Sequence, residues 1–248
     1  MPPDLRARFH ELHQRGLFVM PNPWDVGSAL RMADLGFHAL ATTSSGLAWS
    51  LGKEDQQVTR GELLMHVAAL TGALAVPLSV DAERCFADDL PGVERTVELV
   101  ADAGAAGISI EDYDPATGSI DELTKATDRV AAAATAAKRT GLVLTARAEN
   151  HLYGRSDLAD TIERLTAYRA AGADVVYAPG LVDLDDIHRI VTEVGGPVNA
   201  LRLPGGPSVE ELAEAGVRRV STGGALARTA YAAMVEAASQ LPVALPQQ

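Results

Sequence analysis

Apolar runs of four or five residues recur along the chain, and nearly every run is followed by a stretch with helical spacing of apolar positions. The runs lack the alternation of polar and apolar residues that marks a sheet with one wet face. We therefore expect strands that are buried on both faces of a parallel sheet. The predicted strands are residues 18–21, 39–43, 76–80, 107–110, 143–146, 175–178, 198–201 and 217–221.

The stretches between these runs predict helices, and several of them end in the same way. Gly36, Gly104, Gly172 and Gly216 each stand between a helical stretch and the next apolar run. Glycine at this position adopts the left-handed conformation that ends a helix and turns the chain toward a strand. The predicted helices are residues 27–35, 60–71, 92–103, 120–140, 157–171, 184–194, 208–214 and 225–241.

Eight strand–helix units predict an α/β protein with a (β/α)8 barrel of the TIM type. An open, doubly wound sheet is the alternative, because it uses the same units. We expect a single domain over residues 1–248, with the barrel at about 17–225 and a C-terminal helix at about 225–241. The apolar face of that helix packs either on a neighbouring subunit or on the barrel's own shell.

Composition narrows the possible partners and the compartment. The formal net charge is −12, so the chain is repelled by nucleic acid and by anionic membranes, and we expect neither as a partner. No apolar stretch is long enough to cross a membrane. The one cysteine, Cys85, excludes an intrachain disulfide and a thiolate metal cage, which is typical of a cytoplasmic protein.

Unusual polar residues follow the predicted strands, where a barrel places its active site. Asp81 and Glu83 end the third strand and share one face of an extended segment, and Glu111 ends the fourth. Oxygen ligands of this kind suit a hard cation, Mg2+ or Mn2+. The alternative is that each carboxylate caps the following helix or pairs with a surface lysine.

Arg147 stands at the polar end of the fifth strand, where its guanidinium suits bidentate capture of a carboxylate or phosphonate. The alternative is an ion pair with Glu149 or Glu111. Ser45 and Gly46 follow the second strand and offer donors to an anion, although such a segment is often only a turn.

Two other chemistries are not expected. Cys85 has no histidine near it in sequence, and a small buried cysteine is the commoner state, so catalysis by this thiol is disfavoured. The six histidines fall mostly on predicted helices, which argues against a zinc site.

These motifs resemble the isocitrate lyase and phosphoenolpyruvate mutase superfamily, in family order over roughly residues 18 to 225. The matching pieces are Ser45-Gly46-Leu47, Leu51-Gly52-Lys53-Glu54-Asp55, Val80-Asp81-Ala82-Glu83, Ile108-Ser109-Ile110-Glu111-Asp112, Thr145-Ala146-Arg147-Ala148-Glu149 and Ala167-Tyr168-Arg169-Ala170-Ala171-Gly172-Ala173-Asp174.

The resemblance implies an Mg2+-dependent enzyme that acts on 2-oxo acids or their enol forms, usually as a homotetramer. The position matching Asp81 contacts the metal, and those matching Asp55, Glu83 and Glu111 hold it largely through water. In relatives, the segment matching Ser45-Gly46-Leu47 receives the substrate carboxylate, and the position matching Arg147 binds the anionic end. The cation and Arg147 stabilise charge on an enolate oxygen, so a bond beside the carbonyl can break.

Departures from the family pattern narrow the reaction. Isocitrate and methylisocitrate lyases carry a Lys-Cys-Gly-His loop after the fourth strand, and residues 113–119 contain neither cysteine nor histidine here. Mutase and hydrolase relatives carry a longer lid and a histidine near the end of the sixth strand, where this chain has Tyr177-Ala178-Pro179. Glu83 replaces the usual aspartate, which lengthens one ligand arm by a methylene.

We therefore expect an Mg2+-dependent carbon–carbon lyase, of decarboxylase or retro-aldol type, on a small 2-oxo or 2-hydroxy dicarboxylate. Phosphorus–carbon chemistry on phosphonopyruvate and a non-catalytic 2-oxo-acid-binding protein are the alternatives. A dimer or tetramer is expected on family grounds. The expected catalytic residues are Arg147, Glu149, Tyr113 and Tyr177, the substrate-binding residues Ser45, Gly46, Leu47, Arg147 and Asn199, and the metal ligands Asp81, Glu83, Glu111 and Asp55.

Overall fold

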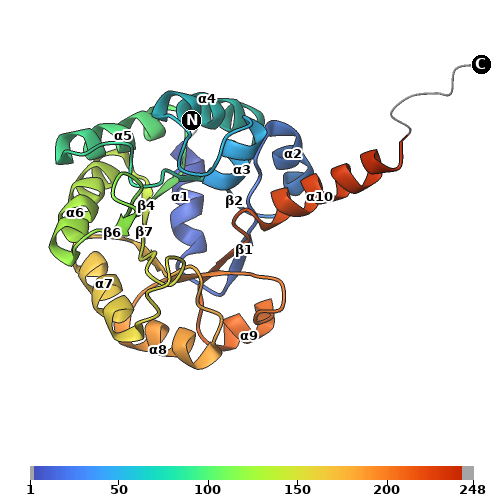
Figure 1. The fold of residues 1–248 in the computed structure, drawn as a ribbon. Helices are drawn as coiled ribbons and strands as arrows, with labels where there is room; N and C mark the ends of the chain where they lie inside the picture. The colour runs from blue at the N-terminus through green and yellow to red at the C-terminus, as the bar shows by residue number, and fades with distance from the viewer. Residues whose placement is uncertain (1–2, 242–248) are drawn as a thin grey trace, which may run out of the picture.

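Eight parallel strands surround a common axis in the computed structural model, which describes residues 3–241 (Figure 1). The order of hydrogen-bonded neighbours is β1-β10-β9-β8-β7-β4-β3-β2. The two end strands approach each other as well, because the Ala41 N–H donates to the Pro21 carbonyl at 3.1 Å. The (β/α)8 barrel is thus confirmed over an open sheet. Its strands are β1 (Phe18–Met20), β2 (Leu40–Ala41), β3 (Leu78–Asp81), β4 (Gly107–Glu111), β7 (Val143–Arg147), β8 (Val175–Tyr177), β9 (Val198–Leu201) and β10 (Arg219–Ser221).

The outer helices lie where the helical spacing predicts them. The four glycines before strands adopt the left-handed conformation, with φ values of 88°, 98°, 109° and 89° at Gly36, Gly104, Gly172 and Gly216. All of these helices except α10 bury one side against the barrel, and this packing encloses the hydrophobic core. These helices are α2 (Val26–Asp34), α4 (Arg60–Ala73), α5 (Leu90–Asp102), α6 (Leu123–Thr140), α7 (Leu158–Ala170), α8 (Leu184–Val194), α9 (Val209–Glu214) and α10 (Ala225–Ser239).

Two short elements differ from the prediction at the ends of strands. Helix α3 (Ser44–Ser50) begins directly after β2, because the Thr43 hydroxyl accepts the Gly46 N–H and caps the first turn. A hairpin of β5 (Tyr113–Asp114) and β6 (Ser119–Ile120) occupies the expected start of the helix at residue 120. The Asp121 N–H donates to the Asp112 carbonyl at 2.7 Å and closes the hairpin, so α6 begins only at Leu123.

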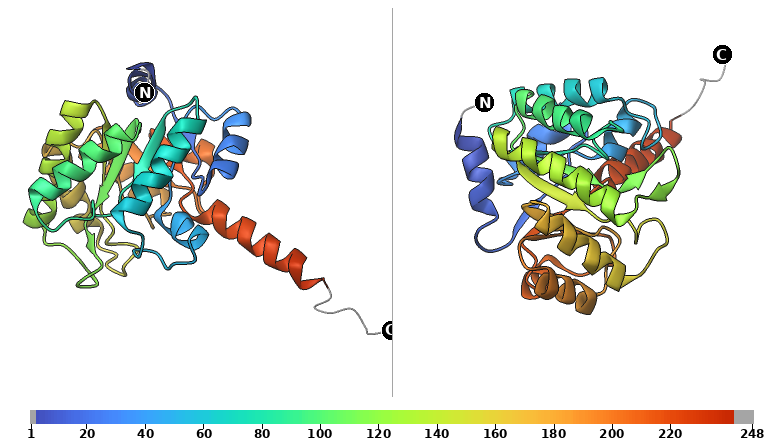
Figure 2. Two further views of the ribbon diagram at one scale, coloured as in Figure 1. Left: turned by 90° about the horizontal axis from the view of Figure 1, so that it is seen from above. Right: turned by 90° about the vertical axis from the view of Figure 1, so that its left-hand side faces the viewer.

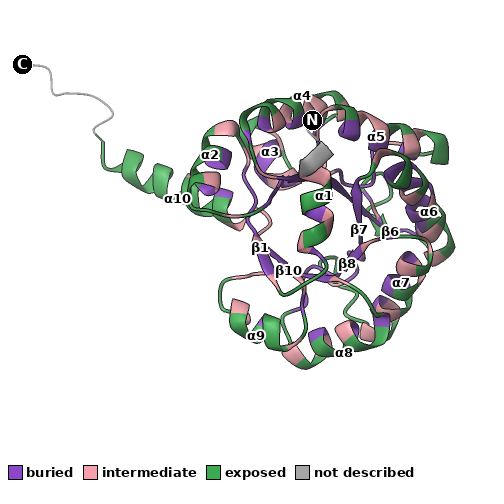
Figure 3. Ribbon diagram, turned by 180° about the vertical axis from the view of Figure 1, so that it is seen from behind, coloured by how far each residue is buried: buried purple, intermediate pink, exposed green. Residues whose placement is uncertain are grey.

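One end of the barrel is covered by α1 (Pro3–Leu12), which crosses the middle of the view in Figure 3. Phe9 is fully buried against Gly107, where an added Cβ would lie 2.5 Å from the ring. Arg6 donates to the carbonyls of Ala101, Ala105 and Thr140, which precede β4 and β7. The covered end is therefore the N-terminal end of the strands, and the C-terminal ends stay open for a site.

Helix α10 projects away from the barrel, as the left view in Figure 2 shows. Ala227 is its one buried residue, whereas Leu226, Met234 and Val235 expose apolar side chains along it. No helix within residues 3–241 combines the length and apolar character that a membrane crossing needs.

Candidate active site

Strands β3, β4 and β7 bring Asp81, Glu111 and Arg147 together at the open end of the barrel. Arg147 is the register partner of Glu111, and Asp81 is the partner of Ser109 on the strand between them. The Arg147 guanidinium lies 2.8 Å from Asp81, 3.3 Å from Glu111 and 2.7 Å from Glu149. The ion pairs that the sequence left as the alternative reading of Arg147 are thus both present, and Asp81 adds a third.

The carboxylates around Arg147 outnumber its charge, and their protonation reflects this. Burial raises the pKa of Glu111 well above its ordinary value, although Arg147 opposes the shift. Burial likewise raises the pKa of Glu149, again against Arg147. Burial, followed by the charges of Asp81 and Asp55, raises the pKa of Glu83 to about 8. The cluster therefore has a deficit of positive charge.

Glu83 is held in this cluster by a strained loop. Its φ is 48°, and Cys85 and Phe86 follow with φ values of 66° and 54°, so three non-glycine residues are left-handed. The buried Arg129 donates to the carbonyls of Arg84 and Ala87 and fixes the loop from outside. The left-handed turn places the Glu83 carboxylate near Asp81 and Asp55, whose negative charges help to raise its pKa.

Asp55 and Gln56 reach the cluster from the loop between α3 and α4. Asp55 is exposed at the rim, and partial desolvation and the Asp81 charge raise its pKa. Gln56 donates through Nε2 to Glu111 Oε1 at 2.9 Å, whereas its Oε1 is buried without a hydrogen-bond partner among the described residues. Sequence reasoning missed Gln56, although it directly follows the motif that contains Asp55.

The donor set fits a hard divalent cation held in part through water. No three acidic, histidine or cysteine side chains within the described ranges stand ready to ligate an ion directly. The carboxylate oxygens are nevertheless crowded around one guanidinium, and Oε1 of Gln56, whose Nε2 bonds to Glu111, is buried without a hydrogen-bond donor among the described residues. A hydrated Mg2+ has the charge and the donors that both features lack. Asp81, Glu83, Glu111 and Asp55 are the residues that could hold it.

The segment Ser45-Gly46-Leu47 forms the first turn of α3 and lies beside Asp81. The Ser44 N–H points to Asp81 Oδ2 at 3.4 Å, and the Ser45 hydroxyl lies 3.2 Å from that of Thr43. Only glycine fits at Gly46, because a Cβ there would lie 2.6 Å from Thr43 Cγ2 and 3.0 Å from Trp24 Cβ. Close packing therefore brings this backbone to the edge of the carboxylate cluster.

Two tyrosines cover the cluster from different loops. The rings of Tyr113 and Tyr153 stack with centroids 3.7 Å apart and an interplanar angle of 8°. Burial, followed by the charges of Glu111 and Glu149, raises the pKa of Tyr153. Sequence reasoning missed Tyr153, because only the fold brings the loop after β7 against the hairpin.

Tyr177 and Asn199 lie deeper than the rim. The Arg147 guanidinium carbon is 5.5 Å from the centroid of the Tyr177 ring, a cation–π arrangement beneath the ion pairs. Asn199 uses both ends of its amide inside the protein, accepting from Arg219 Nε and donating to Ser221 Oγ, each at 2.9 Å. Both polar ends of Asn199 therefore bond to buried neighbours, and its contact with substrate stays a prediction.

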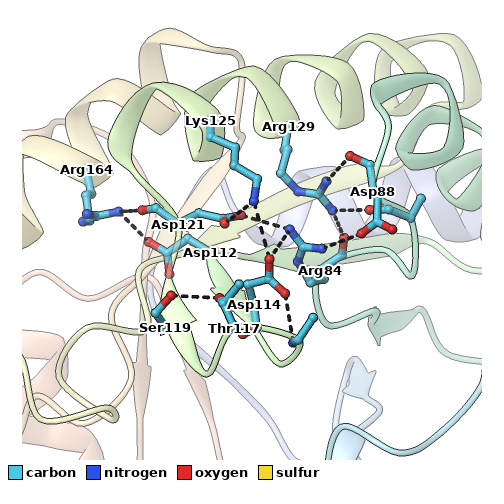
Figure 4. A network of polar contacts seen from close by, with 12 residues as sticks. Arg84, Asp88, Asp112, Asp114, Thr117, Ser119, Asp121, Lys125, Arg129 and Arg164 are labelled. Atoms are coloured by element: carbon cyan, nitrogen blue, oxygen red, sulfur yellow. Dashed lines mark hydrogen bonds and ion pairs between the residues drawn. The ribbon is translucent and has the colours of Figure 1, made fainter.

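A buried network of charges anchors the hairpin and the strand ends (Figure 4). Asp112 accepts the Glu149 N–H at 2.8 Å and the Tyr168 hydroxyl at 2.6 Å, so it fixes the backbone of Glu149. Arg84 joins Asp114 at 3.3 Å and Asp121 at 3.1 Å, one on each side of the hairpin. The expected lid at residues 113–119 is therefore clamped to the barrel body.

Comparison with known proteins agrees with this geometry. Residues 9–242 match the family described as phosphoenolpyruvate phosphomutase. The chain is 30% identical over 220 residues to 2-methylisocitrate lyase of Aeropyrum pernix, covering 84% of this chain and 70% of the relative. It is 30% identical to oxaloacetate decarboxylase 2 of Pseudomonas fluorescens, covering 94% of this chain and 83% of the relative.

A solved structure from Burkholderia cenocepacia J2315, assigned provisionally as a lyase or mutase, is 47% identical. It superposes with a TM-score of 0.92 and covers 96% of this chain and 88% of its own. The fold, the family match and the relatives agree, and the chain belongs to the isocitrate lyase and phosphoenolpyruvate mutase superfamily of lyases and mutases.

Proposed function

We propose that the protein is an Mg2+-dependent carbon–carbon lyase that cleaves a small 2-oxo or 2-hydroxy dicarboxylate through an enolate. The observation that supports this proposal most strongly is that Asp81, Glu111 and Glu149 surround Arg147 at the open end of the barrel. A cluster of carboxylates with too few positive charges to balance them attracts a divalent cation. A cation beside a guanidinium suits a substrate that has a carboxylate next to a carbonyl.

Asp81, Glu83, Glu111 and Asp55 would hold the cation, and Gln56 Oε1 supplies a further acceptor beside Glu111. When bound, Mg2+ polarises the substrate carbonyl and stabilises negative charge on its oxygen. Arg147 binds the carboxylate end of the substrate, and the first turn of α3 at Ser45, Gly46 and Leu47 borders the same space.

In a 2-oxo diacid, the bond to the carboxylate on the carbon next to the carbonyl breaks, that carboxylate leaves as CO2, and the electron pair of the bond moves into the enolate. In a 2-hydroxy diacid, the Glu149 carboxylate first takes the hydroxyl proton, the bond between the hydroxyl-bearing carbon and its neighbour breaks, one fragment leaves as a 2-oxo acid, and the electron pair forms the enolate of the other fragment. The enolate carbon then takes a proton, and Glu149 is the donor that the geometry favours. This carboxyl is almost fully buried, is bonded to Arg147 at 2.7 Å, and has a pKa raised by burial, so it holds a proton closer to neutral pH. The stacked rings of Tyr113 and Tyr153 lie on the loops that follow β4 and β7, at the same end of the barrel.

The lyase reading also rests on the cations available. Transfer of a phosphoryl group needs several positive groups around its equatorial oxygens. Among the described residues, Arg147 is the one cation that pairs with Asp81, Glu111 and Glu149, and the buried Arg219 is the one other guanidinium that lines the adjoining cavity. The named relatives quoted above include a decarboxylase and a lyase, which supports cleavage of a carbon–carbon bond. Phosphonopyruvate chemistry stays the second candidate because the family description names a phosphomutase.

Turnover of a substrate panel tests the proposal. Purified protein with Mg2+ is incubated with oxaloacetate, malate, 2-methylmalate, 2-methylisocitrate and phosphonopyruvate, and products are followed by proton and phosphorus NMR. We expect cleavage of a dicarboxylate that stops on chelation of the metal. Conversion of phosphonopyruvate alone would favour the mutase. Tight binding of oxalate with no product from any compound would favour a non-catalytic binding protein.

We also propose that α10 packs on a second copy of the chain in a homo-oligomer. The helix leaves the barrel after its first turn, and Met234 and Val235 expose 57% and 61% of their surface. Light scattering tests this. A monomer at micromolar concentration would contradict it, and Met234→Glu with Val235→Glu should convert an oligomer into monomers.

A further inference from the structure

Arg219, on β10, is a buried arginine that lies inside the barrel beneath the site. Its Nε donates to Asn199 Oδ1 at 2.9 Å, and its Nη2 donates to Thr145 Oγ1 at 2.9 Å. Its Nη1 lies 3.3 Å from His13 Nε2. A guanidinium carries five N–H groups, so these three contacts leave two N–H groups for another acceptor.

The charge of Arg219 has no counter-charge among the side chains that the structure describes. No carboxylate lies within ion-pair distance, and its partners are an amide, a hydroxyl and an imidazole. The imidazole is neutral, because burial and the nearby Arg219 lower the pKa of His13 to about 3. His13 Nδ1 bonds to the Phe9 carbonyl at 2.7 Å, so Nε2 is the acceptor toward Arg219. A buried, uncompensated charge is costly and calls for an anion.

A cavity of about 40 Å3 connects Arg219 with the candidate active site. Arg147 and Asp81 line its upper part, and Arg219 lines it from below. Hydroxyl groups of Ser79, Ser109 and Ser221 line the wall between them. The wall is therefore rich in donors, and two guanidinium groups face one small space.

The volume limits what this space can hold. A water molecule needs about 10–15 Å3 of such volume, so about 40 Å3 has room for a group of about three non-hydrogen atoms. A carboxylate has three non-hydrogen atoms, whereas a four-carbon diacid has many more. The cavity therefore accommodates one end of a diacid while the rest of that molecule lies at the rim.

We propose that the cavity between Arg147 and Arg219 is a specificity pocket for the second carboxylate of a dicarboxylate substrate, with Arg219 as its ionic partner. The inference rests on the proposed function, because it deepens the substrate class of the same site. It makes Arg219 the residue that distinguishes diacids from monoacids of the same length. A monoacid leaves Arg219 without an anion and so binds more weakly.

Calorimetric titration of organic acids into the full chain, with Mg2+ present throughout, tests this pocket. The matched ligands are malate and 2-hydroxybutyrate, which have equal length and differ by one carboxylate, with oxalate as a reference small enough to bind at the rim alone. In the unmodified protein we expect malate to bind at least about tenfold more tightly than 2-hydroxybutyrate, a factor typical of one buried ionic contact. Arg219→Gln should bring the two affinities together and leave that of oxalate unchanged.

Two further variants separate an effect of the pocket on ligand affinity from effects of impaired folding and of changed net charge. Asn199→Asp places a carboxylate on the existing partner of Arg219 Nε, so it should reduce the preference for malate without lowering the thermal midpoint. Arg218→Gln removes the same charge one residue away, where the side chain bonds to the Gly16 carbonyl, and should leave the preference intact. If Arg219→Gln fails to fold, Asn199→Asp still decides.

The outcomes distinguish this inference from the proposed function. No Mg2+-dependent binding of oxalate in the unmodified protein would contradict the proposed function itself. Oxalate binding with a malate preference that survives both Arg219→Gln and Asn199→Asp would overturn the pocket alone. Chloride binding that Arg219→Gln abolishes, with an unchanged malate preference, would make the cavity an inorganic anion site and would also overturn it.

Discussion

Arg147 Nη1 donates to Asp81 Oδ1 across 2.8 Å, so the residue expected on the substrate is bonded to the residue expected on the metal. Both side chains are largely shielded, with 13% and 15% of their surface exposed. Binding of a cation at Asp81 would therefore weaken this ion pair and release a donor of Arg147. In the proposed function, this hydrogen bond would couple metal binding to capture of the substrate carboxylate.

Replacing Asp81 tests the metal side of this coupling. We expect Asp81→Asn to abolish the rise in thermal midpoint that Mg2+ produces in the unmodified protein, because a ligand that binds the native state stabilises it. Turnover should fall by about 10²-fold or more, the typical loss when one electrostatic stabiliser is removed. Asp88→Asn is the matched control, since Asp88 is exposed and pairs with Arg84 outside the cluster. An unchanged Mg2+ response in Asp81→Asn would rule out this ligand.

Replacing Arg147 tests the charge balance. Arg147→Gln leaves Asp81, Glu111 and Glu149 without their shared cation, and breaking such a buried pair costs about 3–5 kcal/mol. We expect urea unfolding at pH 7 to show a loss of this order in metal-free protein and a smaller loss with Mg2+. A loss of the same size in both conditions would mean that no cation reaches the carboxylates.

The pH dependence follows from Glu83, whose pKa rises from 4.5 to about 8 on folding. A raised pKa means that the folded state binds the proton more tightly, so this contribution to stability is full below about pH 4.5 and is lost as the pH rises through about 8. Metal-free protein should lose thermal stability between these pH values, and Glu83→Gln should flatten the profile. Mg2+ affinity should increase over the same range, and calorimetry that finds it constant would contradict Glu83 as a ligand.

Gly46 offers a test of the close packing beside the cluster. Gly46→Ala would place a Cβ 2.6 Å from Thr43 Cγ2, so we expect a loss of about 1–3 kcal/mol in unfolding free energy. Gly72→Ala in α4 is the control, because nothing lies within 4 Å of its added Cβ. That change should stabilise the protein by about 0.5–1 kcal/mol. Urea unfolding of both variants checks the pair, and equal effects would contradict the packing argument.

The pattern of apolar positions predicts the eight strands because a buried parallel strand is largely apolar along its length, as at Val175–Tyr177. It also places Asp81, Glu111 and Arg147 at one rim. It does not predict α3, whose start depends on a single cap by the Thr43 hydroxyl. Nor does it predict the depth of a side chain within the barrel, and so it does not predict the hydrogen bond between Arg219 and Asn199.

The pattern of apolar positions also does not predict contacts between loops, because loops have no periodic pattern. Tyr153 meets Tyr113 only because the fold brings the β7 loop against the hairpin, and neither loop has a periodic signal. Gln56 reaches Glu111 from a loop 55 residues away in sequence. The left-handed φ of 48° at Glu83 likewise has no signature in a residue that usually avoids this conformation.

Proton NMR of the reaction in D2O tests the central claim most directly. With Mg2+ and a dicarboxylate from the panel, cleavage through an enolate should give a product with one deuterium on the carbon that lost its bond, because the exchangeable proton of Glu149 is replaced by deuterium. The reaction should stop on chelation of the metal and in Asp81→Asn. Absence of a cleaved product from every dicarboxylate, or a product whose new C–H bond carries no deuterium, would contradict an enolate-forming lyase.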